Sequence, residues 1–351
     1  MLNVGEEQPP APPQVLVEKG SRLGFEIIDI RRFEPKEFSA LLEAEGRAWD
    51  NRLRWDFSAS ARVIIACFRE QRLSGYTLVV EGRIRGYCFF FYDGEKGVIG
   101  DLFLHPEVAG QDGERLLLEH TLETLLATPG LHRIEAQLPH YGCDQLAPYF
   151  QPCGFESYLR HFMSVPLNPW RSTVSHLHPR PAVPALREDI ELIAWDPRYQ
   201  DEAGELLYQA YRRHIDARIN NQYTSLLGTT RLLENISNNQ GCGDFLPEVS
   251  RMAVVRPTHR LAGILTITCV RSQVAHIPQV GVSPAFQGLG VGTALMDAAF
   301  SDLAQEGYNE VTLTVTDANS GALRLYDRLG FRIYQSFGAF IYDRDPSFGP
   351  S

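Results

Sequence analysis

The chain has 351 residues, of which 44% are hydrophobic and 22% are charged. This length allows two domains of ordinary size, and the composition is that of a globular protein rather than of a disordered or fibrous one. Acidic residues outnumber basic ones, 43 against 33, which gives a net charge of −10 and no basic surface for nucleic acid. We therefore expect no nucleic-acid partner.

Cysteine usage and the lack of long apolar runs narrow the class further. Six cysteines are scattered singly, at positions 67, 88, 143, 153, 242 and 269. This spacing argues against a metal site or a disulfide framework and favours a reducing, cytoplasmic compartment. No apolar run is long enough to cross a bilayer, so we expect no membrane partner.

In chain order, residues 1–24 contain a proline-rich segment and are predicted to be a flexible arm. Residues 25–167 then alternate between strand and helix patterns. Strands are expected at Phe25–Ile30, Thr77–Val80, Ile84–Tyr92, Val98–Leu104, Arg133–Leu138 and Phe155–Val165, and helices at Pro35–Trp49, Ser58–Glu70, Glu114–Leu126 and Tyr141–Phe150. Residues 168–187 are rich in proline with little periodicity, and are predicted to be a linker.

Residues 188–345 repeat the same order of elements, and residues 346–351 form a tail. Strands are expected at Asp189–Trp195, Arg251–Arg256, Leu261–Val270, Ser272–Val282 and Glu310–Thr316, with one or two more in Phe331–Tyr342. Helices are expected at Gln200–Arg218, Thr229–Ile236 and Asn319–Leu329, and from Leu289 or Gly290 onward. The shared order predicts an internal duplication of a mixed α/β domain.

A glycine-rich turn between a strand and a helix, Val282–Gly292, is the first candidate site. The opening N–H groups of a helix have no intrahelical partner and lie at the positive end of its dipole, so they favour a phosphate. Glycines at 288, 290 and 292 would let the backbone approach such a ligand closely. Tight turns also use glycine for conformational reasons alone, so the turn by itself does not decide the function.

Two motifs make the second half resemble the GNAT superfamily of acyl-CoA-dependent N-acyltransferases. They are Gln287-x-x-Gly290-x-Gly292 and Asn319-x-x-Ala322-x-x-x-Tyr326, the latter followed by Leu329-Gly330-Phe331. With its duplicated order, the whole chain resembles a tandem arrangement of that fold. The resemblance implies two tandem GNAT-like α/β domains, each a central mixed, mostly antiparallel sheet flanked by helices.

The resemblance also implies a donor and a set of site residues. Acetyl-CoA or another acyl-CoA would be the co-substrate, with no metal, held by Val280, Gly281, Val282, Gln287, Gly288, Leu289, Gly290, Val291, Gly292, Asn319, Ala322 and Tyr326. A backbone N–H near Val282 would polarise the thioester carbonyl, and Tyr326 would protonate the departing thiolate. Asn319 is equally suited to be a helix N-cap.

The residue that would deprotonate the attacking amine is less defined. His276, on the strand before the turn, is the first candidate base, and Glu248 is the second. Water could carry the proton instead. The polar run 214–223 lies where the resembling fold shapes its acceptor pocket, but it also fits an ordinary solvated loop.

The first half departs from the glycine motif. An ungapped alignment of its helix start puts Ala109, Asp112 and Glu114 at the motif positions, and Phe150 where the second half has Tyr326. Two carboxylates would repel a pyrophosphate. We therefore expect this half to have the fold without binding CoA.

The sequence thus predicts an N-acyltransferase with an active second half. It would transfer acetyl from acetyl-CoA, by direct attack, to a primary amine of a small molecule or peptide. The alternatives are a CoA-binding regulatory module without catalysis and a scaffold whose first half is the binding surface.

Overall fold

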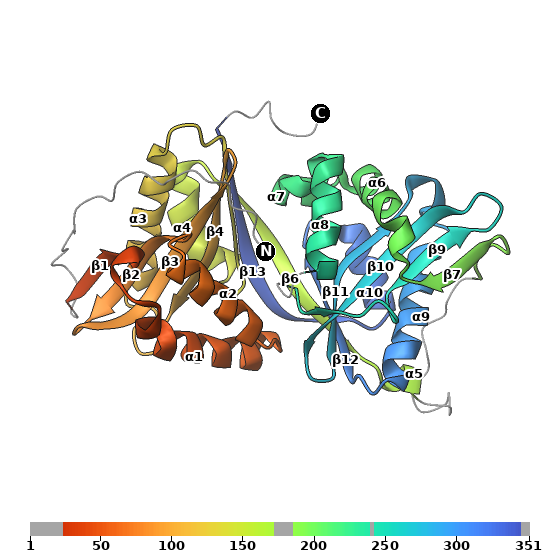
Figure 1. The fold of residues 1–351 in the computed structure, drawn as a ribbon, viewed down its shortest axis with the longest axis horizontal. Coiled ribbons are helices and arrows are strands. Elements are labelled where there is room, and N and C mark those ends of the chain that lie inside the picture. Colours follow the sequence, from red (N-terminus) through yellow and green to blue (C-terminus); the bar gives the residue numbers. More distant parts are fainter. Residues whose placement is uncertain (1–23, 172–184, 239–241, 345–351) are drawn as a thin grey trace. The chain divides into compact units, whose positions relative to one another are not determined.

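The computed structural model describes residues 24–171, 185–238 and 242–344. Within these ranges the chain forms two compact units, which we describe separately (Figure 1). The first contains residues 24–159 and 336–344, and the second contains the described residues from 160 to 335. The predicted arm up to residue 23, most of the predicted linker (172–184) and the predicted tail lie outside the described residues.

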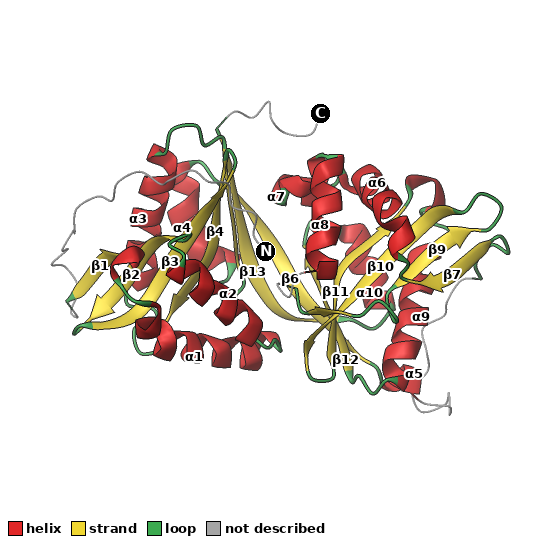
Figure 2. Ribbon diagram, viewed as in Figure 1, coloured by secondary structure: helices red, strands yellow, loops and turns green. Residues whose placement is uncertain are grey.

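The first unit is a mixed sheet with helices on both faces (Figure 2). Its strands, in spatial order, are β1 (Phe25–Asp29), β2 (Ser74–Val80), β3 (Arg83–Asp93), β4 (Lys96–Leu104), β5 (Arg133–Leu138) and β13 (Arg332–Asp343). Its helices are α1 (Ser39–Ala48), α2 (Ser58–Arg69), α3 (Gly113–Ala127) and α4 (Cys143–Phe150). Only the β4–β5 pair is parallel.

Alternation along β3 builds the two cores of this unit. Cys88 and Phe90 belong to the core that includes α3 and α4, whereas Tyr87 and Phe89 belong to the core formed with α1 and α2. A strand with a period of two and apolar residues at successive positions is buried on both faces, which is why helices cover both sides.

The second unit has the same architecture. Its strands, in spatial order, are β6 (Glu156–Pro166), β12 (Glu310–Thr316), β11 (Val274–Val282), β10 (Arg260–Arg271), β9 (Arg251–Val255) and β7 (Ile190–Ala194), and β8 (Asp244–Phe245) pairs with β10. Its helices are α5 (Asn168–Arg171), α6 (Gln200–Tyr211), α7 (Asp216–Ile219), α8 (Leu226–Asn238), α9 (Val291–Gln305) and α10 (Ser320–Arg328). The predicted mixed, mostly antiparallel α/β fold is confirmed in both units.

Each unit takes its last strand from the other half of the sequence. Strand β13 follows α10, yet its residues Gly338–Asp343 pair antiparallel with β5 of the first unit. Strand β6 follows α4, yet its residues Arg160–Pro166 pair with β12 of the second unit. The predicted boundaries, 25–167 and 188–345, divide the chain into continuous segments and do not contain this exchange. A period of two predicts which face of a strand is buried, but it does not predict the neighbouring strand.

Two local predictions differ from the structure. The single helix predicted for Gln200–Arg218 ends at Tyr211 and resumes at Asp216, with a turn in which His214 N–H donates to Tyr211 O at 2.7 Å. The predicted linker begins with the short helix α5, whose Trp170 donates to Asp297 Oδ1 at 2.8 Å and packs on Phe300. The contacts of Trp170 are with residues distant in sequence, which local periodicity does not predict.

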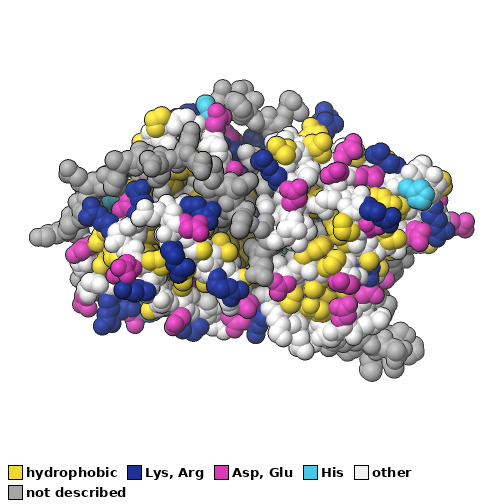
Figure 3. All heavy atoms as spheres, in the orientation of Figure 1, with side chains coloured by type: hydrophobic (Ala, Val, Ile, Leu, Met, Phe, Trp, Pro, Cys, Tyr) yellow, Lys and Arg dark blue, Asp and Glu magenta, His cyan; other side chains and the backbone are white. Residues whose placement is uncertain are grey.

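The cysteines and the surface fit an ordinary globular chain. All six cysteines are free thiols. Acidic and basic side chains are interspersed over the face drawn in Figure 3. Across the three described ranges, no helix combines the length and apolarity needed to span a bilayer.

Candidate active site

The site begins where strands β11 and β12 separate. Their parallel pairing runs from Val274 opposite Glu310 to Ile277 opposite Leu313 and then stops. Strand β11 continues to Val282, still paired with β10 on its other side. Pro278, the first residue after the last pair, has no N–H to offer to a ladder. The two strands therefore separate beyond Ile277 and Leu313.

The peptide groups of two residues on β11 face this opening. Ser283 N–H donates to Ala262 O at 2.9 Å, so that pair is hydrogen-bonded and alternation points Gly281 toward β10. Val280 and Val282 therefore face the opening. Their carbonyl groups accept hydrogen bonds there, Val280 O from the Tyr211 hydroxyl at 2.6 Å and Val282 O from Gln287 Nε2 at 3.2 Å. Their N–H groups lie on the same side.

The glycine turn after β11 opens helix α9 as predicted. Gly288 and Gly290 have φ angles of 75° and 82°, in the region that side chains disfavour, and Gly290 is the N-cap. Ala294 N–H donates to Gly290 O at 3.0 Å, which is the first bond of the helix. The N–H groups of Val291, Gly292 and Thr293 precede it and so point out of the positive end of the helix. The exposed Leu289 completes the turn.

Gln287 links the turn to the strand before it. Its side-chain amide donates a hydrogen bond to the Val282 carbonyl. This bond ties the turn to the end of β11. In the described structure Gln287 therefore positions the turn, while the helix N–H groups face outward.

The second motif places Asn319 and Tyr326 on α10. Asn319 Oδ1 accepts a hydrogen bond from the Ala322 N–H at 3.1 Å, so Asn319 is the N-cap of α10. This is one of the two roles predicted for it. Tyr326 is 6% exposed and packs against Phe331. Burial, followed by the negative charge of Asp216, raises the pKa of Tyr326 above its usual value. Its phenol therefore keeps its proton at neutral pH.

The polar run 214–223 packs over the opening rather than forming a solvated loop. Tyr223, in a short 3-10 helix over Asn221–Thr224, donates from its hydroxyl to Gln279 Oε1 at 2.7 Å. Its ring stacks on that of Tyr211 with centroids 4.5 Å apart and an interplanar angle of 16°. The hydroxyl of Thr316, at the end of β12, donates to Asp216.

Asp216 is the ionised group at the centre of this region. Burial would raise its pKa, but His214, whose Nδ1 lies 3.2 Å from Asp216 Oδ2, together with Arg160 and Thr316, outweighs burial and lowers it. Burial is the largest cause of the raised pKa of Tyr211, Tyr223 and Tyr326. The charge of Asp216 is the next cause for Tyr223 and Tyr326, and for Tyr211 it follows Tyr223 and Tyr326. These three phenols are therefore grouped around one carboxylate.

The two candidate bases are placed less favourably. His276 lies in the paired part of β11, is 6% exposed and has Nδ1 2.9 Å from Thr312 Oγ1. Burial lowers its pKa to about 3, which makes it a weak base for an ammonium group. Glu248 is exposed in the segment before β9, and its main-chain oxygen accepts a hydrogen bond from Arg251.

The first unit has the same strand separation but a different helix start. Pairing between β4 and β5 ends at Ile99 opposite Ala136. At the start of α3, however, Asp112 occupies a left-handed conformation with φ 70°, and Glu114 Oε1 accepts the Gly110 N–H at 3.3 Å. The carboxylates thus occupy the end of the helix where an anion would bind. Phe150, at the position of the catalytic candidate Tyr326, is fully buried.

Comparison with known proteins identifies a family that part of this chain resembles. Residues 186–331 match the model of the acetyltransferase (GNAT) family. A mycothiol acetyltransferase of Kocuria rhizophila is 54% identical over 52 residues, which are 15% of this chain and 17% of that protein. Another, of Gordonia bronchialis, is 36% identical over 102 residues, or 29% and 33%. The matched segments thus span a third or less of these relatives.

Solved structures match over most of the chain at low identity. A GCN5-related N-acetyltransferase from Sphaerobacter thermophilus has a TM-score of 0.63 and 18% identity, covering 91% of this chain and 96% of its own. A tandem GNAT protein from the clavulanic acid biosynthesis pathway has a TM-score of 0.58 and 16% identity, covering 92% and 99%. At this identity the likeness shows the fold.

Proposed function

We propose that this chain is a member of the acetyltransferase (GNAT) family, whose model matches residues 186–331, and that its second unit transfers acetyl from acetyl-CoA to a primary amine of a small molecule or peptide. The observation that carries the proposal is the separation of β11 from β12. The same unit contains the start of α9, whose N–H groups would bind an anion, and Tyr326, which would donate a proton. The comparisons support the donor class.

The donor would lie along the opened strand. The N–H groups of Val291, Gly292 and Thr293 would bind the pyrophosphate at the start of α9. Val280 N–H would bind the thioester carbonyl, because Pro278, nearer the closed end of the opening, has no N–H. A donor fixed in place before the reaction stabilises the oxyanion without reorganisation.

The chemistry needs one acid and one proton acceptor. The neutral amine attacks the thioester carbon and forms the C–N bond, after which the C–S bond breaks. The thiolate takes the phenolic proton of Tyr326, the amine loses a proton to water, and the phenolate is reprotonated from water. The products are the amide and free CoA thiol. Because His276 is buried with a lowered pKa and Glu248 is exposed, we propose water rather than either residue as the acceptor.

The first test measures free thiol released from acetyl-CoA against a panel of amines. Tyr326→Phe removes the proton donor and keeps the ring, so kcat should fall by about a hundredfold to ten-thousandfold while acetyl-CoA binding is retained. Tyr208→Phe, on α6, is the control and should behave like the wild type. If wild type and Tyr326→Phe released thiol equally, at the background rate, the proposal that the chain is an enzyme would be refuted. If the wild-type protein still bound CoA, the alternative function of a CoA-binding regulatory module would be favoured.

A further inference from the structure

Two tyrosines fixed on the opened part of β11 form what we call the tyrosine clamp, Tyr211 and Tyr223. Tyr211 donates to the main-chain oxygen of Val280, and Tyr223 donates to the side-chain oxygen of Gln279. The two rings stack nearly parallel. Each ring is therefore held at its hydroxyl end by β11 and along its face by the other ring.

The clamp contacts the residue that we assign to the thioester. The carbonyl and the N–H of Val280 both face the opening. The carbonyl accepts a hydrogen bond from Tyr211, and the N–H lies on the same side of the strand. A thioester carbonyl bound at that N–H would lie beside the Tyr211 phenol. The acyl chain attached to the carbonyl must then extend into the space that this phenol borders.

The space for the acyl chain is closed at its inner end by buried side chains. At the closed end of the opening, Ile277 and Leu313 are 4% and 1% exposed. Moving Tyr211 aside would break its hydrogen bond to the Val280 carbonyl and its ring stack on Tyr223. The space cannot widen without that loss.

We propose that the tyrosine clamp restricts the acyl group to short chains, acetyl and propionyl, and excludes longer ones. This inference rests on the proposed function, because it concerns the acyl group of the same donor. A rigid pocket discriminates by roughly tenfold or more for each methylene that does not fit. The clamp is therefore expected to determine acyl length, whereas the α9 turn binds the CoA moiety common to all donors.

The experiment compares acetyl-, propionyl-, butyryl- and hexanoyl-CoA with one amine that the wild type accepts. The measured quantity is the ratio of kcat/KM for each longer donor to that for acetyl-CoA. The wild type should show a ratio below about one hundredth for hexanoyl-CoA. Tyr211→Ala and Tyr223→Ala should each raise this ratio by about tenfold or more, since each removes one ring. Tyr211→Phe keeps the ring but loses its bond to Val280, so its ratio should lie between those of the wild type and Tyr211→Ala. Tyr208→Ala on the same helix is the matched control.

Two results would contradict the inference that the tyrosine clamp limits acyl length. A wild type that uses hexanoyl-CoA as well as acetyl-CoA would overturn the inference, as would clamp variants whose ratio equals that of Tyr208→Ala. Equilibrium binding of acetyl- and hexanoyl-CoA to the same proteins gives a second readout, in which only the clamp variants should gain affinity for the longer donor. If no donor releases thiol with any amine, the proposed function fails. If acetyl-CoA is used but length selection does not depend on the clamp, only this inference fails.

Discussion

Tyr326 combines two properties that a proton donor to a thiolate needs at neutral pH. It is buried, and the Asp216 carboxylate is close enough to add to the rise in its pKa. Since an ordinary tyrosine has a pKa of about 10, the acid form of Tyr326 should persist above that pH. The alkaline loss of kcat/KM should accordingly lie above pH ~10, while the acid-side limb reports the amine.

Asp216→Asn tests this electrostatic link. The substitution removes a negative charge that raises the pKa of Tyr326, so the alkaline limb of the kcat/KM profile should move to lower pH. Asparagine can still accept the hydrogen bond from Thr316, which limits other changes. An alkaline limb that stays in place or moves upward would show that Tyr326 is not the titrating acid.

At the scale of elements, helix α1 and strand β4 of the first unit enclose two carboxyl groups. Glu45 is fully buried and accepts hydrogen bonds from Trp49 Nε1, at 3.1 Å, and from the Tyr87 hydroxyl. Asp101 lies next to it on the separated part of β4. Burial raises the pKa of both groups, and for Glu45 the nearby Asp101 raises it further. The pair thus retains a proton that the unfolded chain would release.

This retained proton predicts a stability that falls as pH rises. A group whose pKa is raised by folding stabilises the folded state fully below its unfolded pKa and loses that contribution as pH approaches its folded pKa. The free energy of unfolding should therefore fall by up to about 1.4 kcal/mol per pH unit above pH ~5. Glu45→Gln should flatten this slope, whereas Glu43→Gln, an exposed control on the same helix, should not. Urea unfolding at several pH values measures both, and an unchanged slope in Glu45→Gln would contradict the shared proton.

Elements and motifs differ in how far the sequence predicts them. Strand β12 has the predicted bounds because Val311, Leu313 and Val315 alternate and are all buried. Tyr326 was predicted because its spacing from Asn319 matches a family motif. Tyr211 was missed as a site residue because it lies at helical spacing on an apolar face, and its partner, the Val280 carbonyl, is 69 residues away. Local periodicity contains no information about such a contact.

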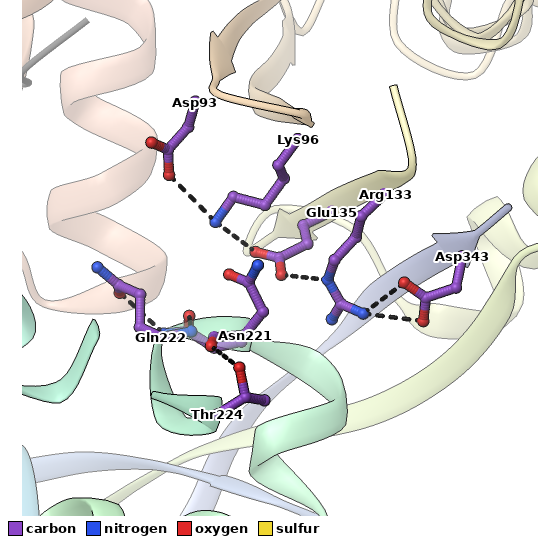
Figure 4. A network of polar contacts seen from close by, with 9 residues as sticks. Asp93, Lys96, Arg133, Glu135, Asn221, Gln222, Thr224 and Asp343 are labelled. Carbon is purple, nitrogen blue, oxygen red and sulfur yellow. Dashed lines mark hydrogen bonds and ion pairs between the residues drawn. The ribbon is translucent and has the colours of Figure 1, made fainter. Parts of the chain in front are cut away.

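At the scale of the whole molecule, the strand exchange makes each unit depend on both halves of the sequence. In the first unit, Phe340 of β13 stacks on Phe150 with ring centroids 4.1 Å apart. Arg133 of β5 donates to both carboxylate oxygens of Asp343 on β13, and it also contacts Glu135, which pairs with Lys96 (Figure 4). Strand β13 is therefore fixed to the first unit by a ladder, a ring stack and a partly buried ionic network.

Truncation before residue 336 should consequently damage the unit that is distant in sequence. Loss of a buried phenylalanine alone costs about 3–5 kcal/mol, and this deletion also removes the ladder on β5 and leaves Arg133 without Asp343. Trp49 and Trp55 belong to the first unit, and Trp170 and Trp195 belong to the second. Replacing both tryptophans of one unit by phenylalanine leaves a protein whose tryptophan fluorescence reports the unfolding of the other unit. Ending the chain at Gln335 should unfold the first unit at a lower urea concentration than in the full chain, whereas ending it at Arg344 should not. If the Trp49 and Trp55 signals in the chain ending at Gln335 unfolded at the full-chain midpoint, β13 would not be part of the first unit in solution.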